Sequence, residues 1–168
     1  MAGQLACGRV LKGNLVLEQK KLVVSSHSIS GLLAHFVWAT KGRLPFITPA
    51  IERRVYRYIA GICRRNGCSL VALGGTENHV HLLVYLGAQI TQADLVNEVK
   101  GASSRFASEL LGTEGVFAWQ RGYAVFGVSP QHKERVQRYI QKQKEHHDSG
   151  ELWPGVESFD EPDEESTV

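Results

Sequence analysis

The stretch His79-Val-His-Leu-Leu-Val-Tyr-Leu86 decides the fold that we expect, because it reads as a strand that enters a hydrophobic core. Successive side chains of a strand point to opposite faces, so His79 and His81 should leave the same face close together. Two imidazoles placed in this way form half of a metal site. Two hydrogen-bonded histidines on a half-buried strand would give the same pattern, so the pair alone leaves both interpretations open.

The segments around this strand predict a small antiparallel sheet. A strand at 69–73 precedes it, and a turn at 74–78 joins the two. The other predicted elements are, in chain order, a strand at 32–39, a helix from Thr48-Pro49 to Asn66-Gly67, a helix from Thr91 to Gly112, a strand at 116–128 interrupted by Gly122, and a helix from Ser129-Pro130 to about residue 147. The order β-α-β-β-α-β is typical of an α+β, ferredoxin-like or RRM-like antiparallel sheet with helices on one face, here with an additional C-terminal helix. We expect the other face of the sheet to be open, because many sheets of this type bind single-stranded nucleic acid there.

Composition divides the chain into three regions. Residues 31–150 form the predicted domain, preceded by an N-terminal extension at residues 1–30. In this extension, 14–17 and 21–24 could pair as a hairpin, although a loose arm fits equally well. Residues 151–168 are rich in Pro, Gly, Ser and acidic residues, which predicts a disordered acidic tail.

Charge is unevenly distributed along the chain, although the net charge is only +2. Residues 31–147 carry 15 Lys/Arg against 8 Asp/Glu, whereas residues 148–168 carry 8 Asp/Glu and no Lys/Arg. A basic body is typical of proteins that bind a polyanion, although a solvated surface beside a disordered tail would explain the same counts.

Several protein classes are disfavoured by the composition. No apolar run approaches the roughly 18 residues that a membrane helix needs, and residues 1–30 lack the pattern of a signal peptide. The three cysteines include no C-x-x-C pair, which argues against a disulfide framework or a zinc knuckle. We therefore expect a cytoplasmic protein with no membrane association.

The last predicted helix carries a second pair of polar side chains. Tyr139 and Gln143 are four residues apart, so they should lie on one helical face. Cations on the same helix, among them Arg138 and Lys142, would surround a phosphate brought to Tyr139. A core tyrosine beside a peripheral glutamine would give the same spacing.

Taken together, these motifs resemble the single-tyrosine HUH transposases of bacterial insertion sequences and the related repeat-associated tyrosine transposases. The resemblance covers roughly residues 31–147, in the order and spacing of that family. The matching stretches are Trp38-Ala-Thr-Lys-Gly-Arg43, Glu77-Asn-His-Val-His-Leu-Leu-Val84, Lys100-Gly-Ala-Ser-Ser-Arg105, Phe117-Ala-Trp-Gln-Arg-Gly-Tyr123, Tyr139-Ile-Gln-Lys-Gln143 and Glu145-His-His147.

The resemblance implies a metal-dependent enzyme that cleaves and rejoins single-stranded DNA. His79, His81 and Gln143 would hold a divalent metal, Mg²⁺ or Mn²⁺, and Tyr139 would form a 5′-phosphotyrosine. Because these ligands carry no formal charge and include imidazole, we expect Mn²⁺ to support activity at least as well as Mg²⁺. No P-loop is present, so no nucleotide cofactor is expected.

The resemblance also implies partners and a cellular setting. The substrate would be single-stranded DNA, with hairpins at the ends of an element, in the nucleoid of a bacterial or archaeal cell, and the enzyme would act as a homodimer. The expected DNA contacts are Lys41, Arg43, Lys100, Arg105, Arg121, Arg138 and Lys142.

The sequence departs from the family pattern at three places. Asn78 stands where relatives often carry Asp, Gly74-Gly75 where an apolar residue is common, and Gly127 in place of a frequent Ser. None of these changes removes a proposed catalytic group.

Two other functions remain open at this stage. One is a non-catalytic module that binds single-stranded nucleic acid, and the other is a domesticated or replication-type HUH nickase. A phosphoesterase with two H-x-Ser/Thr motifs is disfavoured, because the chain lacks the second copy of the motif.

Overall fold

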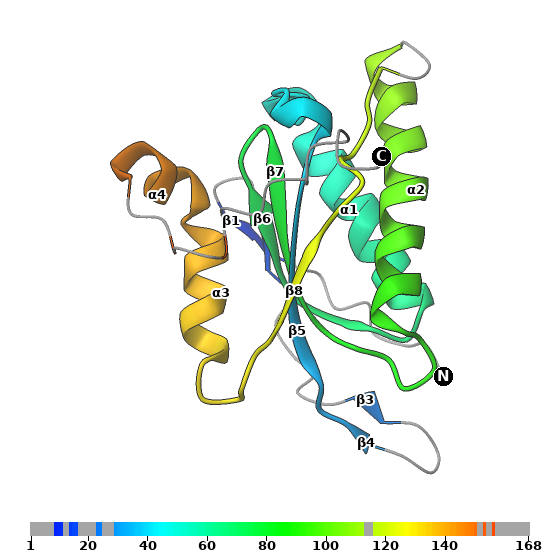
Figure 1. Cartoon of the computed structure of the whole chain (residues 1–168), viewed down its shortest axis with the longest axis vertical. Helices are drawn as coiled ribbons and strands as arrows, with labels where there is room; N and C mark the ends of the chain where they lie inside the picture. The colour runs from blue at the N-terminus through cyan, green and yellow to red at the C-terminus, as the bar shows by residue number, and fades with distance from the viewer. Residues whose placement is uncertain are drawn as a thin grey trace, which may run out of the picture.

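A computed structural model describes residues 9–11, 14–16, 23–24, 29–112, 116–150, 153 and 156. Its centre is an antiparallel sheet that includes β5 (Leu33–Ala39), β6 (Ser69–Gly75), β7 (His79–Tyr85) and β8 (Ala124–Gly127), in the order β6-β7-β5-β8 (Figure 1). β1 (Arg9–Leu11) and β2 (Asn14–Val16) extend it beyond β6, where Leu15 pairs with Leu73. β3 (Val23–Val24) and β4 (Ile29–Ser30) form a separate two-stranded pair.

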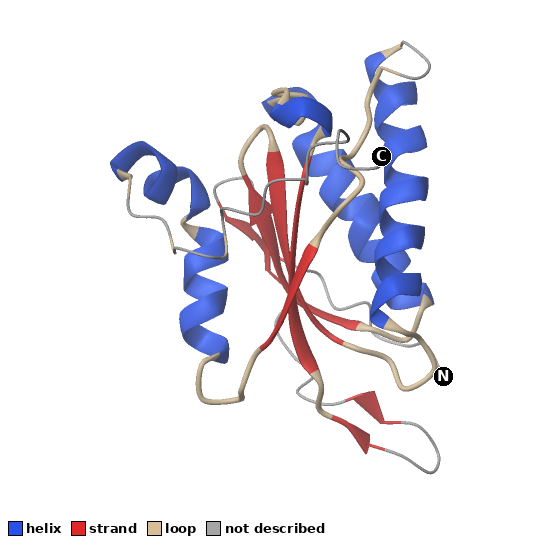
Figure 2. Ribbon diagram, viewed as in Figure 1, coloured by secondary structure: helices blue, strands red, loops and turns tan. Residues whose placement is uncertain are grey.

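Helices lie on both faces of this sheet. α1 (Pro49–Arg65) and α2 (Gln92–Leu111) cover one face, whereas α3 (Lys133–Gln141) lies against β6 and β7 on the other and leads into α4 (Gln143–Ser149) (Figure 2). The α+β fold class is confirmed. The expectation that the second face is open is wrong within the described residues, because α3 packs there.

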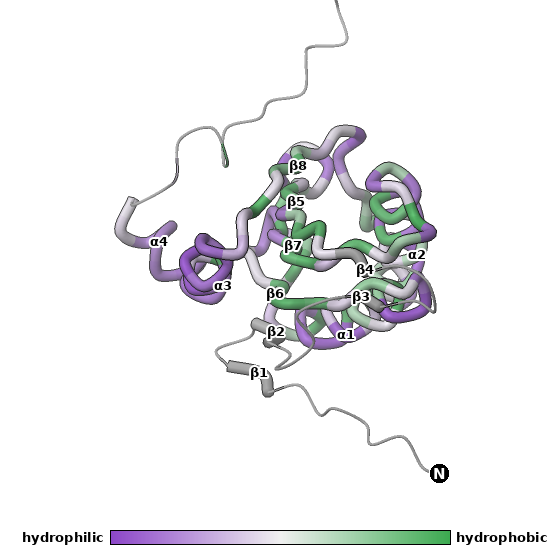
Figure 3. Tube along the Cα trace, turned by 90° about the horizontal axis from the view of Figure 1, so that it is seen from below, coloured by the Kyte–Doolittle hydropathy of each residue, from purple (hydrophilic) through white to green (hydrophobic). Residues whose placement is uncertain are grey.

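The period of two along the strands separates two hydrophobic clusters. Phe36 and Leu82 point towards α1 and α2 and belong to the larger core. Leu83 and Tyr85 point the other way and pack with Val136 of α3. Seen from below, the mostly apolar strands β6 and β7 lie between the mostly hydrophilic α3 on one side and α1 and α2 on the other (Figure 3). Both faces of β7 are therefore buried.

Local chemistry sets the ends of α1 and α2 much as predicted, whereas α3 begins at Lys133 and not at Ser129-Pro130. The Thr91 hydroxyl accepts a hydrogen bond from the Asp94 N–H at 3.1 Å and caps α2, which ends at Gly112 with a φ of 71°. α1 begins at Pro49 after Thr48, and the chain leaves it through Gly67 at a φ of 67°. None of the helices in the described part of the chain combines the length and apolar character that crossing a membrane requires.

The predicted strand at 116–128 is wrong over its first half. Only Ala124–Gly127 forms a strand, preceded by an isolated bridge between Trp119 and Thr40. Side chains of α2 hydrogen-bond to the backbone of the segment that precedes β8. Ser104 donates to the Phe117 carbonyl at 2.8 Å, and Lys100 donates to the carbonyls of residues 120–122. These bonds hold residues 117–122 against α2, and the ladder between β8 and β5 begins only at Ala124.

Two further predictions are corrected. The last helix is not continuous, because Lys142 adopts a φ of −104° and divides it into α3 and α4. A hairpin between 14–17 and 21–24 is wrong, since β2 pairs with β1 and β6, and β3 pairs with β4. The predicted disordered tail at 151–168 lies outside the described residues, apart from Trp153 and Val156.

Candidate active site

His79 begins β7, and its ring is held from behind by the turn that precedes it. Its Nδ1 lies 2.8 Å from both the Asn78 Oδ1 and the Thr76 Oγ1 atoms, and the Thr76 hydroxyl itself donates to Asn78. Because an amide oxygen only accepts, these contacts place the proton of the ring on Nδ1. Asn78 thus supplies the acceptor oxygen that an Asp would supply, and the Nε2 lone pair of His79 faces away from the turn.

Gly75 makes this turn possible by its lack of a side chain. A Cβ atom there would lie 2.2 Å from the His79 carbonyl oxygen and 2.9 Å from the Val80 Cα atom. Both contacts are far shorter than van der Waals separation, so any larger residue would push the start of β7 away. The departure at Gly74-Gly75 therefore accompanies an unusually close approach of β6 to His79.

Gln143 meets His79 from the opposite side. It is fully buried at the start of α4, and its Oε1 atom lies 3.1 Å from His79 Nε2. With the imidazole proton on Nδ1, both facing atoms are acceptors, an arrangement that a cation between them satisfies. At a separation of 3.1 Å, the two acceptor atoms are close enough for one divalent cation to be held by both. An amide turned to present its NH₂ group would also satisfy the contact.

His81 completes the predicted ligand set on the same strand face. Its ring centroid lies 5.0 Å from that of His79, as the period of two requires. Its Nδ1 atom lies 3.0 Å from Nε2 of His35, a buried residue of β5. Among the described residues no three His, Cys, Asp or Glu side chains gather as a metal site, so the residues present fit a cation only with the Gln143 amide included.

Tyr139 lies beside this group within the same chain. Its ring centroid is 5.8 Å from that of His81, nearly edge-on, and only 3% of the residue is exposed. His146 stacks on it at 5.0 Å, whereas His147 lies 4.7 Å from His79. The described residues thus bring tyrosine, glutamine and both histidines of the motif together without a second copy of the chain.

An ion pair fastens α4 to α1. Lys144 lies 2.9 Å from both carboxylate oxygens of Glu52, whose side chain is 6% exposed. Lys144 follows Gln143 directly, so this contact holds the backbone that presents the glutamine. Glu52 also acts on Tyr56: burial first, and the nearby carboxylate second, raise the pKa of that phenol well above its usual value.

Six of the seven predicted DNA contacts lie in three places on the chain, and Lys100 is the seventh. Lys41 and Arg43, in the short helix η1 (Lys41–Arg43), follow β5 at the end of the sheet where Ala39 pairs with His79. Arg121 belongs to the adjoining segment, since the N–H of residue 120 donates to the Ala39 carbonyl at 2.9 Å. Arg138 and Lys142 are exposed beside Tyr139, and Arg105 is exposed on α2.

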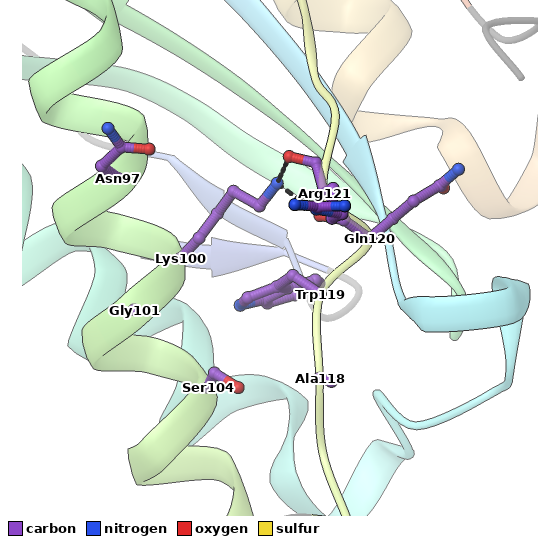
Figure 4. Close-up of a pocket in the computed structure, with 8 residues that line it drawn as sticks. All are labelled: Asn97, Lys100, Gly101, Ser104, Ala118, Trp119, Gln120 and Arg121. Carbon is purple, nitrogen blue, oxygen red and sulfur yellow. Dashed lines mark hydrogen bonds between the residues drawn. The ribbon is translucent and has the colours of Figure 1, made fainter. Parts of the chain in front are cut away.

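Lys100 is placed differently from the other predicted contacts. Its ammonium group donates to the carbonyl of Arg121 at 2.8 Å and to that of Gln120 (Figure 4), and also to the carbonyl of Gly122 at 2.9 Å. The pocket beside it, of about 300 Å³, is lined by Asn97, Lys100, Gly101, Ser104, Ala118, Trp119, Gln120 and Arg121. The three hydrogen bonds of its ammonium group thus link α2 to residues 120–122.

Several site residues were missed from the sequence. His35 carried a signal, a polar residue within an apolar strand, and Glu52 is an acidic residue on the buried side of an amphipathic helix. Trp153 carried none, because it lies in a segment without periodicity. It stacks on Tyr139 with ring centroids 4.0 Å apart.

Comparisons with known proteins place the chain among transposases. The family described as "Transposase IS200 like" matches residues 28–143. The chain is 27% identical over 134 residues to the ISDra2 transposase TnpA of Deinococcus radiodurans, covering 77% of this chain and 94% of that protein. It is also similar to a crystal structure assigned to a transposase from D. radiodurans R1, with 30% identity, a TM-score of 0.56, and coverage of 71% of this chain and 95% of the other.

A more distant likeness extends to the fold. The REP-associated tyrosine transposase bound to a REP hairpin shares 14% identity with this chain, at a TM-score of 0.55 and with 78% of this chain and 79% of the other covered. The family match spans more than half of the chain and includes both histidines, Tyr139 and Gln143. The chain therefore belongs to the IS200-like transposase family.

Proposed function

We propose that this transposase cleaves and rejoins single-stranded DNA through a phosphotyrosine at Tyr139, with a divalent metal held by His79, His81 and Gln143. The observation that carries the proposal is the meeting of β7, α3 and α4 in one chain. It sets the Tyr139 ring 5.8 Å from His81, and Gln143 Oε1 3.1 Å from His79 Nε2.

The chemistry assigns a distinct part to each residue. His79, His81 and Gln143 would hold a divalent metal, which would supply Lewis-acid withdrawal of negative charge from the phosphate. The Tyr139 Oη atom attacks phosphorus, the P–O3′ bond breaks, and the released O3′ takes up a proton. The product is a 5′-phosphotyrosine with a free 3′-hydroxyl, which remains a phosphodiester. A 3′-hydroxyl can therefore reverse the step without ATP.

Proton transfer requires a base close to Tyr139, whose phenol is a weak nucleophile in its neutral form. His146 stacks directly on the Tyr139 ring, whereas His147 lies beside His79. We infer that one of these histidines takes the phenolic proton and returns it to O3′. His35 holds the His81 ring at its Nδ1 atom. Asn78 and Thr76 hold the His79 ring at its Nδ1 atom.

The proposed substrate follows from the charges around the site and from the fold. Lys41, Arg43 and Arg121 gather at the His79 end of the sheet, while Arg138 and Lys142 flank Tyr139. Such cations track a phosphate backbone. Because a transposase of the same fold was solved with a hairpin, hairpin DNA is the form of substrate we propose.

A single-turnover assay tests the proposal. Labelled single-stranded oligonucleotides, with and without hairpins, are incubated with the wild type, Tyr139→Phe and Tyr58→Phe, and covalent adducts are counted on denaturing gels. Tyr58 is a matched control, since it stacks on Phe106 between α1 and α2, away from the histidines. We expect an adduct with the wild type and Tyr58→Phe only. An adduct with Tyr139→Phe, or none with any protein, would contradict the mechanism.

The metal is tested in the same assay. A chelator should abolish the adduct, and Mn²⁺ should support it at least as well as Mg²⁺, because imidazole and amide ligands suit Mn²⁺. Gln143→Glu should shift the preference towards Mg²⁺, since a carboxylate is the ligand that Mg²⁺ favours. A clear Mg²⁺ preference of the wild type would argue against this ligand set.

A homodimer stays a prediction. Tyr139 faces the histidines of its own chain, so a dimer is not required to complete the site in this arrangement. Mixing Tyr139→Phe with His81→Ala distinguishes the two cases. Recovered activity would mean that tyrosine and histidines come from different copies, whereas a site formed within one chain gives none.

A further inference from the structure

We propose that Tyr139 and Arg135 form a stacking site for a nucleobase of the DNA substrate, and that Trp153 of the same chain occupies this site until DNA displaces it. The inference rests on the proposed function, because it takes Tyr139 as the nucleophile and single-stranded DNA as the substrate.

Three contacts place Trp153 on the tyrosine. The two rings are nearly parallel, 12° apart, with centroids separated by 4.0 Å. The backbone N–H of Trp153 donates a hydrogen bond to the Tyr139 Oη atom at 3.2 Å. The Arg135 guanidinium lies over the indole ring, 5.1 Å from its centre. Trp153 is thus held by ring stacking, by a hydrogen bond of its backbone and by a cation–π contact.

The consequence is that the proposed nucleophile is covered. Trp153 and His146 both stack on the Tyr139 ring, and His81 meets it edge-on. The Oη atom that must reach phosphorus accepts a hydrogen bond from the backbone of the covering residue. A phosphodiester cannot approach Oη along this side while Trp153 is in place, so binding of substrate and binding of Trp153 exclude each other.

The chemistry of the site identifies the competing ligand. A flat aromatic surface with an exposed arginine beside it accepts a nucleobase by stacking and its phosphate by charge. Indole and nucleobase are both flat and of similar size, so one can replace the other. A nucleotide next to the scissile phosphate would reach the Tyr139 ring as the phosphate reaches Oη.

The charges of the C-terminal sequence and of α3 also support reversible binding of Trp153 at this site. Residues 148–168 carry 8 Asp/Glu and no Lys/Arg, whereas the helix beneath Trp153 and its end carry Lys133, Arg135, Arg138 and Lys142. Opposite charge therefore favours attraction between the acidic sequence that carries Trp153 and α3, in which Glu134 is the one acidic residue. Salt and DNA both weaken that attraction.

The main experiment measures displacement directly. Trp38 is fully buried and Trp119 is 8% exposed, whereas Trp153 is half-buried, so the fluorescence difference between wild type and Trp153→Phe reports on Trp153. Acrylamide quenching is measured with chelator present, while a single-stranded hairpin oligonucleotide is added. We expect DNA to make Trp153 more accessible to the quencher. Unchanged or reduced quenching at saturating DNA would overturn the proposal.

Adduct formation provides the second readout. At subsaturating DNA, Trp153→Ala should form the adduct roughly three- to thirty-fold faster than the wild type, because an internal competitor reduces apparent affinity by the covered fraction. At saturating DNA the rates should converge. Trp153→Phe, which keeps a smaller ring, should lie between them. A Trp153→Ala rate equal to or below that of the wild type, in a protein with an unchanged melting temperature, would contradict the competition.

Two controls separate the effect of the indole ring from the effect of the acidic residues and of impaired folding. Replacing Asp160, Glu161, Asp163, Glu164 and Glu165 by their amides keeps the indole and removes charge, so it shows how much of the effect is electrostatic. If Trp153→Ala impairs folding, Trp153→Leu is measured in its place, because it keeps an apolar side chain and removes the stacking ring. If no protein forms an adduct, the proposed function fails, and the quenching experiment still decides whether DNA displaces Trp153.

Discussion

The ion pair between Glu52 and Lys144 should stabilise the fold asymmetrically. The Glu52 side chain is 6% exposed and that of Lys144 is 43% exposed, with both carboxylate oxygens 2.9 Å from the ammonium nitrogen. Removing Lys144 leaves a buried carboxylate without its partner, whereas removing the charge of Glu52 leaves an ammonium group that water can reach. Lys144→Met should therefore cost more than Glu52→Gln.

The cost of each substitution can be placed between the values known for fully buried and for exposed ion pairs. Breaking a fully buried pair costs about 3–5 kcal/mol, and exposed pairs contribute about 0–1 kcal/mol. With one partner buried and the other half-exposed, Lys144→Met should lower the unfolding free energy by about 2–3 kcal/mol and Glu52→Gln by about 1 kcal/mol. For a chain of this size that is a fall in melting temperature of roughly 4–12 °C for the former and 2–4 °C for the latter.

A double-mutant cycle measures the pair itself. Urea unfolding of the wild type, both single variants and the double variant should give a coupling energy of about 1–2 kcal/mol. The control is the pair Lys142–Glu145, which is 3.7 Å apart with side chains 59% and 47% exposed, and should give at most about 0.5 kcal/mol. Equal coupling in the two pairs, or a larger cost for Glu52→Gln than for Lys144→Met, would refute the reasoning.

The three remaining predictions concern other contacts of the site and the core. Lys100→Met should lower the unfolding free energy by about 2 kcal/mol through its lost carbonyl contacts and leave the salt dependence of DNA binding unchanged, whereas Arg105→Met should change that slope by about 0.7. The reverse pattern, measured by fluorescence titration at several salt concentrations, would make Lys100 the DNA contact. Gly75→Ala should destabilise the chain by about 2–3 kcal/mol and weaken Mn²⁺ binding measured by calorimetry, because the added methyl group meets the backbone of His79; unchanged values for both would show that the turn can yield. Burial raises the pKa of the Cys63 thiol, so this residue contributes stability below the ordinary thiol pKa, and that contribution falls by about 1.4 kcal/mol per pH unit above it, as the unfolded chain ionises first. Urea unfolding at pH 8 and pH 10 should show a smaller loss in Cys63→Ala than in the wild type, and equal losses would exclude the effect.

Local chemistry explains which elements were predictable. The Thr91 cap and the left-handed Gly112 set the ends of α2 from within a few residues of sequence. The segment 116–123 was not predictable in this way. Its composition favours a strand, but Lys100 and Ser104 bind its carbonyls from a helix that is 13–22 residues distant in sequence.

The two pairs of the candidate site show the same division. Tyr139 and Gln143 were expected on one continuous helix, but the break at Lys142 puts them on α3 and α4. The break accompanies the contact of Lys144 with Glu52, 92 residues away. No periodicity within a helix can indicate such a contact.

The shared face of His79 and His81 was determined by sequence alone, because the alternation of side chains is a property of the extended backbone. Only the tertiary structure decided what that face meets. Gln143 lies 64 residues further along the chain from His79, and Trp153 reaches Tyr139 from beyond the last helix. These contacts depend on how α3 crosses β6 and β7, and that packing is the sum of many weak apolar contacts rather than of any local motif.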